Sequence, residues 1–401
     1  MISVEDACAR ILAAVQPLSP IDAPLVQALG SYAAADHFAK VDLPGFDNSA
    51  MDGYAVRSAD LKGTSVERPV ALPCIVRIAA GECPTTSIHM GQCARVFTGS
   101  MMPEGADAVV MQEDVVTEGG RVRFVEAVKP LENVRLRGED VRKDSKIVGG
   151  GDKLTAARLG LLAASGHGSA LVRRSCRVAL LATGSELLEP GMELRPGGIY
   201  ESNRTMLAAL LAPLKCSVET YPIVRDDLES TIAALRTAFN GADLVLSSGG
   251  VSVGEYDFVK EAFQTLGGSV DLWQIAMRPG KPFTFGQWNG KFLCGLPGNP
   301  VSAFVSFVLL VRPALLKMNG AMLPAHARIE AELVESIVNR GDRRHFARVR
   351  VEKGKIYLAG GQKSHMIGSL SQANALLDVA PGVELKPGSR AQVILWELPE
   401  S

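Results

Sequence analysis

Strand-like and helix-like segments alternate between Arg177 and about Gly320, and this alternation constrains the fold more than any other feature of the chain. The apolar runs RVALLAT, SVETYPIV, ADLVLSS and KFLCGLPG are typical of buried strands. The segments NRTMLAALLAPL, with Asn203 as its expected cap, DDLESTIAALRTAFN and NPVSAFVSFVLLV have the pattern of helices. Repeated strand–helix units predict a doubly wound α/β domain with its ligand crevice at the carboxyl ends of the strands.

The flanking segments follow a different pattern. From about Leu43 to Gly150 the chain is rich in Gly and Pro and contains the short extended runs ALPCIVRIA, CARVF, AVVMQEDVV and RVRFVEAV, which predict a β-rich domain. LTAARLGLLAASG then returns to helical spacing. After Pro324, the runs ARIEAELVES, HFARVRVEKGKIYLAG and RAQVILWEL alternate apolar and polar residues around Gly and Asp turns, which predicts a small β-barrel. We therefore expect a multidomain α/β protein.

The bulk composition argues against several classes of protein. The 401 residues, 47% of them hydrophobic, suffice for several cores. With 42 Lys and Arg against 43 Asp and Glu, the net charge of -1 offers no electrostatic footprint for nucleic acid. Seven cysteines without a C-x-x-C pair favour reduced thiols, as in a cytoplasmic protein.

We expect no membrane-spanning segment. The N-terminal MISVEDACARILAAVQPL has Glu5 and Asp6 near its start and apolar residues at helical spacing, which indicates an amphipathic helix rather than a signal peptide. The longest apolar run, from Val301 to Val311, is expected to stop at Arg312-Pro313. A membrane span requires about 18 to 20 residues, so this run predicts a buried helix in a soluble protein.

Polar, glycine-rich segments follow three of the expected strands. SSGGVSVGEYDF, residues 247 to 258, leads into a helix, where free backbone N–H groups bind anions. It lacks the lysine of a P-loop and carries the acids Glu255 and Asp257. GLPGNPVS and TGSEL occupy the same position on two other strands, although Ser185 is also a candidate helix cap. Their convergence on one sheet edge predicts an anion or nucleotide site.

Further polar segments have simpler alternatives. PGFDNSAMDGYAVR and FTGSMMPEGADAVVMQED place Asp52 and Thr98 in loops that are equally consistent with Asx-rich turns. RGEDVRKDS is equally consistent with a solvated charge cluster. MRPGKPFTFG holds Arg278 and Lys281 around a Pro-Gly turn, which suits a polyanionic ligand unless it is a solvated hairpin tip. The chain has no Ser-His-Asp order and no G-x-S-x-G motif, so hydrolytic nucleophile chemistry has no support.

Taken together, these segments resemble one family. FDNSAMDGYA, TGSMMPEGADAVVMQED, GED, TGSEL, YESNRTML, SSGGVSVGEYDF, RPGKP and GLPGNPVSAF occur in the order seen in the MoeA family of molybdopterin molybdenumtransferases, which is similar to the E domain of gephyrin. The match runs over essentially the whole chain. It implies an elongated homodimer of four-part subunits whose cleft is shared between the α/β domain of one subunit and elements of the other.

The resemblance also implies a reaction. The family inserts molybdate into the dithiolene of adenylylated molybdopterin (molybdopterin-AMP), with Mg²⁺ assistance and release of AMP. A molybdopterin adenylyltransferase would deliver the substrate, and apo-molybdoenzymes or their chaperones would receive the cofactor; neither nucleic acid nor membrane is involved. The charges agree, because a metal ion and cationic side chains offset the repulsion between a phosphoanhydride and an oxyanion.

The resemblance further implies how the chain is divided. An N-terminal helix would pack with the α/β domain, two segments would form a linking domain, and a MogA-like α/β domain would bind molybdopterin. The implied pieces are the N-terminal helix in 1–26, the linking domain in 27–49 and 146–176, the β-rich domain in 50–145, the α/β domain in 177–322 and the C-terminal β-barrel in 323–401.

Carried over residue by residue, the family motifs imply three groups of site residues. Polar side chains important to the reaction fall at Asp52, Thr98, Asp140, Glu186, Asp226 and Asp257. Of these, Glu186 and Asp257 would hold Mg²⁺ or orient the leaving phosphate through it. Substrate would be bound by Ser247, Gly249, Gly250, Ser252, Arg278, Lys281, Pro297, Asn299 and Ser302, and molybdate by Arg348 and Ser364.

Two positions depart from the family pattern, which often has lysine at both. Arg278 keeps the charge and adds a bidentate fork, whereas Gln274 loses a charge and is expected to weaken binding of the adenylate. Three alternatives stay open at this point. They are a cofactor-binding scaffold without turnover, a molybdopterin adenylyltransferase, and a paralogue that inserts tungstate.

Overall fold

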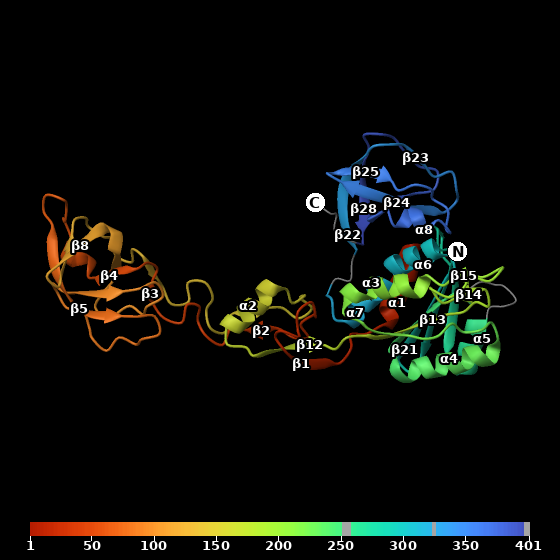
Figure 1. The fold of residues 1–401 in the computed structure, drawn as a ribbon, viewed down its shortest axis with the longest axis horizontal. Helices are drawn as coiled ribbons and strands as arrows, with labels where there is room; N and C mark the ends of the chain where they lie inside the picture. The colour runs from red at the N-terminus through yellow and green to blue at the C-terminus, as the bar shows by residue number, and fades with distance from the viewer. Residues whose placement is uncertain (251–257, 323–325, 397–401) are drawn as a thin grey trace.

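A computed structural model describes residues 1–250, 258–322 and 326–396, with the backbone alone at Leu272. The molecule is elongated (Figure 1), with a β-rich domain at one end and an α/β domain with a C-terminal barrel at the other. The chain starts beside the α/β domain, runs out to the far end and returns before residue 177. The β-rich domain is therefore distant from the carboxyl edge of the α/β sheet, where the ligand site was predicted.

The β-rich domain is built on one six-stranded sheet with the strand order β7-β4-β6-β5-β9-β8. The AVVMQEDVV run forms two strands, because a 3-10 turn, η2 (Gln112–Asp114), interrupts it. The strands are β4 (Gly53–Val56), β5 (Val70–Ile78), β6 (Cys93–Val96), β7 (Ala108–Met111), β8 (Val115–Glu118) and β9 (Arg121–Phe124), with η1 (Ser58–Leu61) after β4.

In the narrow middle of the molecule, the outgoing and returning chain segments pair with each other in antiparallel fashion. Thr155 caps the predicted helix there, since its side chain accepts a hydrogen bond from the Arg158 amide. The pairs are β1 (Pro20–Pro24) with β12 (Ser169–Arg173) and β2 (His37–Phe38) with β11 (Lys146–Val148), beside α2 (Ala156–Ala164). A third pair, β3 (Asn48–Ser49) with β10 (Val134–Arg135), lies at the β-rich domain.

The predicted doubly wound α/β domain is confirmed. Its sheet has the order β16-β13-β17-β21-β20-β18, in which the first four strands are parallel and the last two join antiparallel. The antiparallel edge was not predicted. The strands are β13 (Arg177–Ala182), β16 (Ser217–Thr220), β17 (Leu244–Ser248), β18 (Ser269–Gln274), β20 (Pro282–Trp288) and β21 (Lys291–Leu296), with a small pair β14 (Leu187–Leu188) and β15 (Ile199–Tyr200).

Helices cover both faces of this sheet, because the buried strands are apolar on both sides. Leu180 and Leu246 face one core cluster, while Leu181 and Val245 face the other. The first cluster is shared with α1 (Val4–Ala14), α3 (Asn203–Leu211), η3 (Ala212–Leu214), α6 (Pro300–Ser306) and α7 (Arg312–Met318), and the second with α4 (Leu228–Gly241) and α5 (Phe258–Thr265).

The helix after GLPGNP is longer than predicted. It does not stop at Arg312-Pro313, because a π-helical segment, η4 (Phe307–Val311), joins α6 to α7 and the missing proline N–H falls in the first turn of α7. The run Pro300–Met318 is 19 residues long and apolar enough to cross a membrane by length and composition, but 89% of its apolar 18-residue window is buried inside the protein. Its apolar character is therefore accounted for by the core.

The predicted C-terminal β-barrel is also confirmed. The strands β24, β25, β22, β28 and β26 follow each other in the sheet, and β24 also pairs with β26, which closes the ring. Strand β19 (Met277–Arg278) of the α/β domain adds to β24 in parallel and so fastens the two domains together. The remaining elements are β22 (Ala327–Leu333), β23 (Ile337–Val338), β24 (Arg344–Glu352), β25 (Lys355–Leu358), α8 (Ile367–Leu370), β26 (Ala375–Val379), β27 (Glu384–Leu385) and β28 (Arg390–Leu395).

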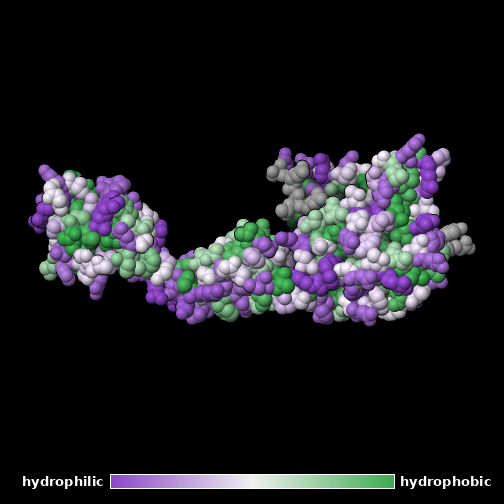
Figure 2. All heavy atoms as spheres, turned by 60° about the horizontal axis from the view of Figure 1, so that its bottom comes forward, coloured by the Kyte–Doolittle hydropathy of each residue, from purple (hydrophilic) through white to green (hydrophobic). Residues whose placement is uncertain are grey.

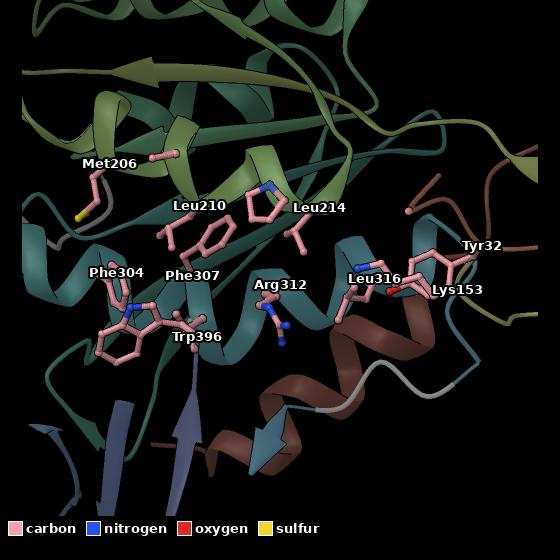
Figure 3. A pocket seen from close by; sticks show the side chains of 14 residues that line it. Tyr32, Lys153, Met206, Leu210, Leu214, Phe304, Phe307, Arg312, Leu316 and Trp396 are labelled. Carbon is pink, nitrogen blue, oxygen red and sulfur yellow. The ribbon is translucent and has the colours of Figure 1, made fainter. Parts of the chain in front are cut away.

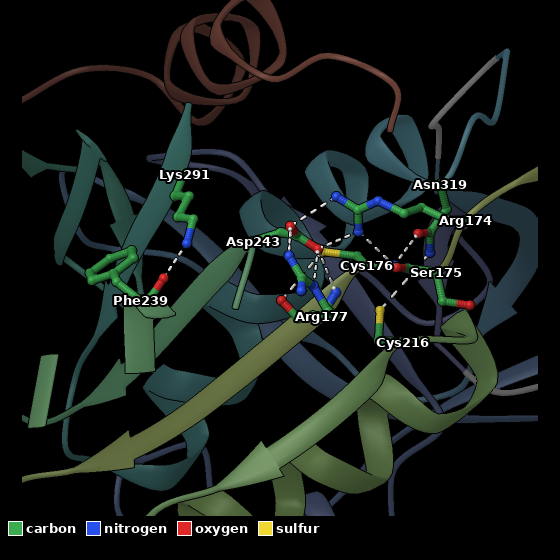
Figure 4. A network of polar contacts seen from close by, with 9 residues as sticks. All are labelled: Arg174, Ser175, Cys176, Arg177, Cys216, Phe239, Asp243, Lys291 and Asn319. Carbon is green, nitrogen blue, oxygen red and sulfur yellow. Dashed lines mark hydrogen bonds and ion pairs between the residues drawn. The ribbon is translucent and has the colours of Figure 1, made fainter. Parts of the chain in front are cut away.

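An ion-pair network fixes the amino ends of β13 and β17 (Figure 4). Asp243, just before β17, accepts hydrogen bonds from Arg174 Nη1 at 2.6 Å and from the backbone amide and Nη2 of Arg177, both at 3.0 Å. Burial alone would raise the pKa of Asp243, but the two arginines lower it far below its usual range. This network anchors the end of the sheet opposite the predicted site.

Candidate functional site

Three loops meet at the carboxyl edge of the α/β sheet, as the sequence predicted. They follow the neighbouring parallel strands β13, β17 and β21. The Gly249 amide donates to the Leu296 carbonyl at 3.0 Å, and the Thr183 amide donates to the Ser248 carbonyl at 3.1 Å. Backbone hydrogen bonds therefore hold the three loops side by side.

Asn203 fastens two of these loops together. Its Nδ2 donates to Ser248 Oγ at 2.6 Å and to the Gly298 carbonyl at 2.8 Å. The prediction that Asn203 caps α3 is wrong. Glu201 takes that task, because its carboxylate accepts from the backbone amides of Asn203 at 2.7 Å and Arg204 at 3.0 Å.

The glycines after β17 form a backbone cradle that larger residues would not fit. Gly249 and Gly250 have φ of 85° and 68°. A Cβ on Gly249 would lie 2.7 Å from the Thr183 carbonyl oxygen, and one on Gly250 would lie 2.4 Å from Val259 Cγ2. Ser247, at the end of β17, is buried and donates to the Gly249 carbonyl at 3.1 Å. Pro297 and Asn299 belong to the adjoining loop after β21.

Two predicted carboxylates lie on neighbouring loops at the same edge. Asp226 accepts a hydrogen bond from the Ser185 amide at 2.7 Å, directly before the exposed Glu186. No α-helix follows Ser185 at once, since the chain continues into β14, so a helix-capping role for Ser185 is wrong. Asp257 and Ser252 lie outside the described residues. Among the described ones, no group of three or more His, Cys, Asp or Glu side chains is arranged to hold a metal ion.

A cationic pocket opens between the α/β domain and the barrel, with a volume of about 630 Å³. It brings together four predicted residues from distant parts of the chain. Two further cations, Arg343 and Lys363, were not predicted, although Lys363 directly precedes Ser364. The pocket is lined by Arg278, Pro279, Gly280, Lys281, Pro282, Ser302, Arg343, Gln362, Lys363, Ser364 and His365, among which there is no carboxylate.

The loop that carries Ser364 is held from both sides. On the pocket side, the Val301 amide at the start of α6 donates to the Ser364 carbonyl at 3.2 Å. Behind the loop, Arg348 is fully buried, and its Nη2 donates to the carbonyls of Gly361 at 2.6 Å and Lys363 at 3.2 Å. Burial lowers the pKa of Arg348. Arg348 thus supports the loop from behind and is not among the residues that line the pocket.

The remaining predicted residues lie elsewhere. Asp52 and Thr98 come together in the β-rich domain, where Asp52 Oδ1 accepts from the amide and from the hydroxyl of Thr98, both at 2.8 Å. These two bonds lower the pKa of Asp52. Asp140 lies exposed on a loop, and its backbone amide donates to the Leu43 carbonyl at 3.0 Å. Within one chain, the β-rich domain that holds Asp52 and Thr98 lies at the other end of the molecule from the α/β sheet (Figure 1).

A second pocket, of about 310 Å³, lies between α3 and the helix run from α6 to α7 (Figure 3). Its walls are largely apolar, with Met206, Leu210, Phe304 and Phe307 among them, and Arg312 also lines it. None of the predicted site residues lines this pocket.

Comparisons with known proteins cover nearly the whole chain. A family model described as MoeA N-terminal region (domain I and II) matches residues 2–166, one described as probable molybdopterin binding domain matches 179–317, and one described as MoeA C-terminal region (domain IV) matches 330–396. The three matched regions thus follow one another in the order of the domains seen in Figure 1.

Individual relatives agree with the family models. A molybdopterin molybdenumtransferase of Haemophilus influenzae is 38% identical, with 88% of each chain covered. Molybdopterin molybdenumtransferase 2 of Mycobacterium tuberculosis is also 38% identical, over 99% of this chain and 100% of that one. A crystal structure of a molybdopterin biosynthesis MoeA protein from Pyrococcus horikoshii superposes with a TM-score of 0.84 at 31% identity, covering 99% of both chains.

Proposed function

Since this chain belongs to the MoeA family of molybdopterin molybdenumtransferases, we propose that it transfers molybdenum from molybdate into adenylylated molybdopterin and releases AMP. It is a transferase of molybdenum cofactor biosynthesis. The individual steps assigned below to side chains are part of the proposal.

One observation carries the proposal, namely that the glycine cradle and the cationic pocket lie at the two ends of one short segment. Pro297 and Asn299 belong to the cradle edge, and Ser302, in the first turn of α6, lines the pocket. A phosphorylated pterin held at the cradle would therefore have an oxyanion bound in the pocket as its neighbour. Lys281 and Arg278 supply the charge that attracts a dianion, and Ser302 and Ser364 supply hydroxyls for its oxygens.

Magnesium fits the carboxylates at the sheet edge. Mg²⁺ takes oxygen ligands and is usually held by one or two carboxylates together with substrate phosphates and water. Glu186, on a loop beside the cradle, and Asp257 would hold it, and Asp226, on the loop next to Glu186, would add a third carboxylate. When bound, the ion would offset charge on the phosphates as AMP departs. The chain's own contribution is to orient the phosphate through the backbone amides of the cradle.

We further propose that a second copy of the chain completes the site. Thr98 is exposed and Asp52 is half-buried in the β-rich domain, at the other end of the molecule from the α/β sheet of the same chain. Large apolar side chains are exposed along the middle section, where Figure 2 also shows hydrophobic surface. They include Ile21, Val26, Leu29, Phe38, Val41 and Phe46. A cytoplasmic homodimer that buries them would bring Asp52 of one copy to the cradle of the other.

The cellular partners follow from the chemistry of substrate and product. Adenylylated molybdopterin would be delivered by a molybdopterin adenylyltransferase, because this reaction consumes the product of adenylylation. Apo-molybdoenzymes or their chaperones would receive the finished cofactor.

The test is a defined reaction with purified protein. Given adenylylated molybdopterin, molybdate and Mg²⁺, the protein should release AMP and yield cofactor that reconstitutes an apo-molybdoenzyme, and EDTA should stop both. AMP release that does not respond to molybdate would contradict the proposal. Binding without AMP release would instead indicate a scaffold, and ATP consumption without molybdate would indicate an adenylyltransferase. Replacing molybdate by tungstate in the same assay measures metal preference.

A further inference from the structure

Arg278 enters the cationic pocket from β19, and its neighbour on the adjacent strand is a histidine. In the parallel pairing of β19 with β24, Arg278 lies directly opposite His345. Arg278 Nη2 is 3.0 Å from His345 Nδ1. A guanidinium has only donors, so His345 Nδ1 accepts this hydrogen bond and the ring proton lies on Nε2. His345 is therefore neutral when it holds Arg278.

The surroundings keep this histidine neutral. His345 is only 4% exposed, and its Nε2 is buried without a hydrogen-bond partner among the described residues. Burial, reinforced by the charges of Arg278 and Arg348, lowers the pKa of His345 to about 4. A proton on Nδ1 would remove the acceptor and add a third positive charge to this group. The hydrogen bond is consequently maintained throughout the neutral pH range.

Several other arginines of the chain have acidic partners. Arg344, the residue before His345, pairs with Asp378 and Glu5, and Arg174 pairs with Asp243. A carboxylate in the place of His345 would hold Arg278 equally well but would cancel much of its field in the pocket. A neutral acceptor orients the guanidinium and leaves its charge intact for a ligand.

We propose that His345 is a positioning residue that directs Arg278 into the pocket without neutralising it, and thereby sets the affinity for a doubly charged tetrahedral oxyanion. This rests on the proposed function, in which molybdate occupies the pocket. His345 does not line the pocket itself, so its effect is transmitted through Arg278. The proposed role requires that the acceptor be neutral. A purely structural role would be filled by any well-packed acceptor, whether neutral or charged.

The experiment compares neutral and charged acceptors in the full-length protein. Molybdate binding is measured by calorimetry for wild type, His345→Gln and His345→Asp. The amide of Gln keeps a neutral acceptor, so its dissociation constant should stay within about threefold of wild type. The carboxylate of Asp should weaken binding by at least about tenfold, because it pairs with Arg278 and cancels much of the field of this guanidinium in the pocket. In the AMP-release assay, KM for molybdate should rise in His345→Asp while kcat changes less than about threefold.

A second set of variants keeps the inference testable if the buried aspartate disturbs folding. Arg278→Gln changes an exposed side chain and should weaken molybdate binding as much as His345→Asp does. Adding His345→Asp to Arg278→Gln should then cause little further loss, because both changes act through one guanidinium. If His345→Gln and His345→Asp lose the same molybdate affinity while their thermal melting is unchanged, the charge of the acceptor does not matter and the inference is overturned.

Lys281→Ala separates failure of this inference from failure of the proposed function. If Lys281→Ala weakens molybdate binding and His345→Asp does not, the pocket is the oxyanion site and His345 has no positioning role. If neither change alters binding, the pocket is not the oxyanion site, and the assignment of molybdate to it falls together with the inference. Lys386→Ala, at an exposed turn of the barrel, is the matched control and should bind as wild type does.

Discussion

Thr98 donates two hydrogen bonds to one carboxylate oxygen of Asp52, from its amide and from its hydroxyl, each 2.8 Å long. The two residues are 46 positions apart and belong to separate loops of the β-rich domain. The paired bonds fix the direction of the carboxylate and keep it ionised, so that its second oxygen remains available. An oriented carboxylate so far from the sheet edge of its own chain is the reason to test for a site shared between copies.

The first prediction is that two inactive variants complement each other. Asp52→Ala and Lys281→Ala should each abolish most AMP release, because one removes the carboxylate and the other the pocket cation. Mixed under conditions that exchange subunits, they should recover about a quarter of wild-type activity, since half of the dimers carry both changes and each of these has one intact site. The measurement is AMP release before and after mixing.

The control is a mixture of two variants of the same pocket, Lys281→Ala and Arg278→Gln. In these mixed dimers both sites remain damaged, so mixing should restore nothing. Recovery in this control, or its absence in the first mixture when size-exclusion chromatography shows that subunits have exchanged, would contradict a shared site.

The second prediction concerns the bridge between two loops. Asn203→Ala removes the donor that joins Ser248 and Gly298, which leaves a buried hydroxyl and a carbonyl without this partner. We expect a loss of roughly 1 to 2 kcal/mol in stability and a larger fall in kcat/KM for adenylylated molybdopterin, because the cradle loses its shape. Thermal melting and AMP release measure the two effects. Thr205→Ala, an exposed change on the same helix, should leave both unchanged.

Much of this edge of the sheet could be predicted from local patterns. The alternation of apolar strands and amphipathic helices determines which strands are parallel neighbours, and so which loops meet. Predictions from local sequence patterns were wrong where a residue suited to one structural role takes another in the fold. Asn203 has the chemistry of a cap, but Glu201 reaches the same amides and releases Asn203 to bind the loops. Pro313 has the chemistry of a helix breaker, but it falls in the first turn of α7.

Only some of the residues that form the cationic pocket could be predicted from the sequence. The RPGKP turn combines two cations with a stiff backbone, so Arg278 and Lys281 could be predicted from the sequence. Arg343 and His345 lie in a β-rich tail with no local signal; Arg343 reaches the pocket, and His345 reaches Arg278, only because β24 pairs with β19 across the domain boundary. Such a contact depends on tertiary structure, which no short window of sequence encodes.

The third prediction tests the glycine cradle. Gly249→Ala would put a Cβ 2.7 Å from the Thr183 carbonyl, a backbone atom that cannot move without disturbing β13, and would also strain a φ of 85°. We expect a loss of at least about tenfold in kcat/KM for adenylylated molybdopterin. Gly160→Ala in α2 is the matched control. No atom lies within 4 Å of its added Cβ, and it should retain activity and gain roughly 0.5 to 1 kcal/mol. Equal activity in the two variants would argue against a backbone cradle.

The fourth prediction links the stability of the α/β domain to pH. Because Arg174 and Arg177 lower the pKa of Asp243 in the folded protein, the network stabilises the fold at any pH above the usual carboxylate range near 4. As pH falls below about 4, the unfolded chain takes up a proton at this position before the folded protein does, and that contribution is progressively lost. Asp243→Ala should cost roughly 2 kcal/mol at neutral pH, less than a fully buried pair because the Arg177 side chain is 51% exposed.

The measurement is urea unfolding between pH 3 and 8, followed by the fluorescence of Trp273 and Trp288, which both lie in the strands of the α/β sheet. The difference in the free energy of unfolding between wild type and Asp243→Ala should be constant above about pH 5 and should narrow towards pH 3. Acid removes from the wild type the stabilisation by the ionised carboxylate, which the variant already lacks. Asp271→Ala, an exposed change on β18, should follow the wild-type curve throughout. A difference that stays constant down to pH 3 would show that Asp243 stabilises the sheet through packing and not through its charge.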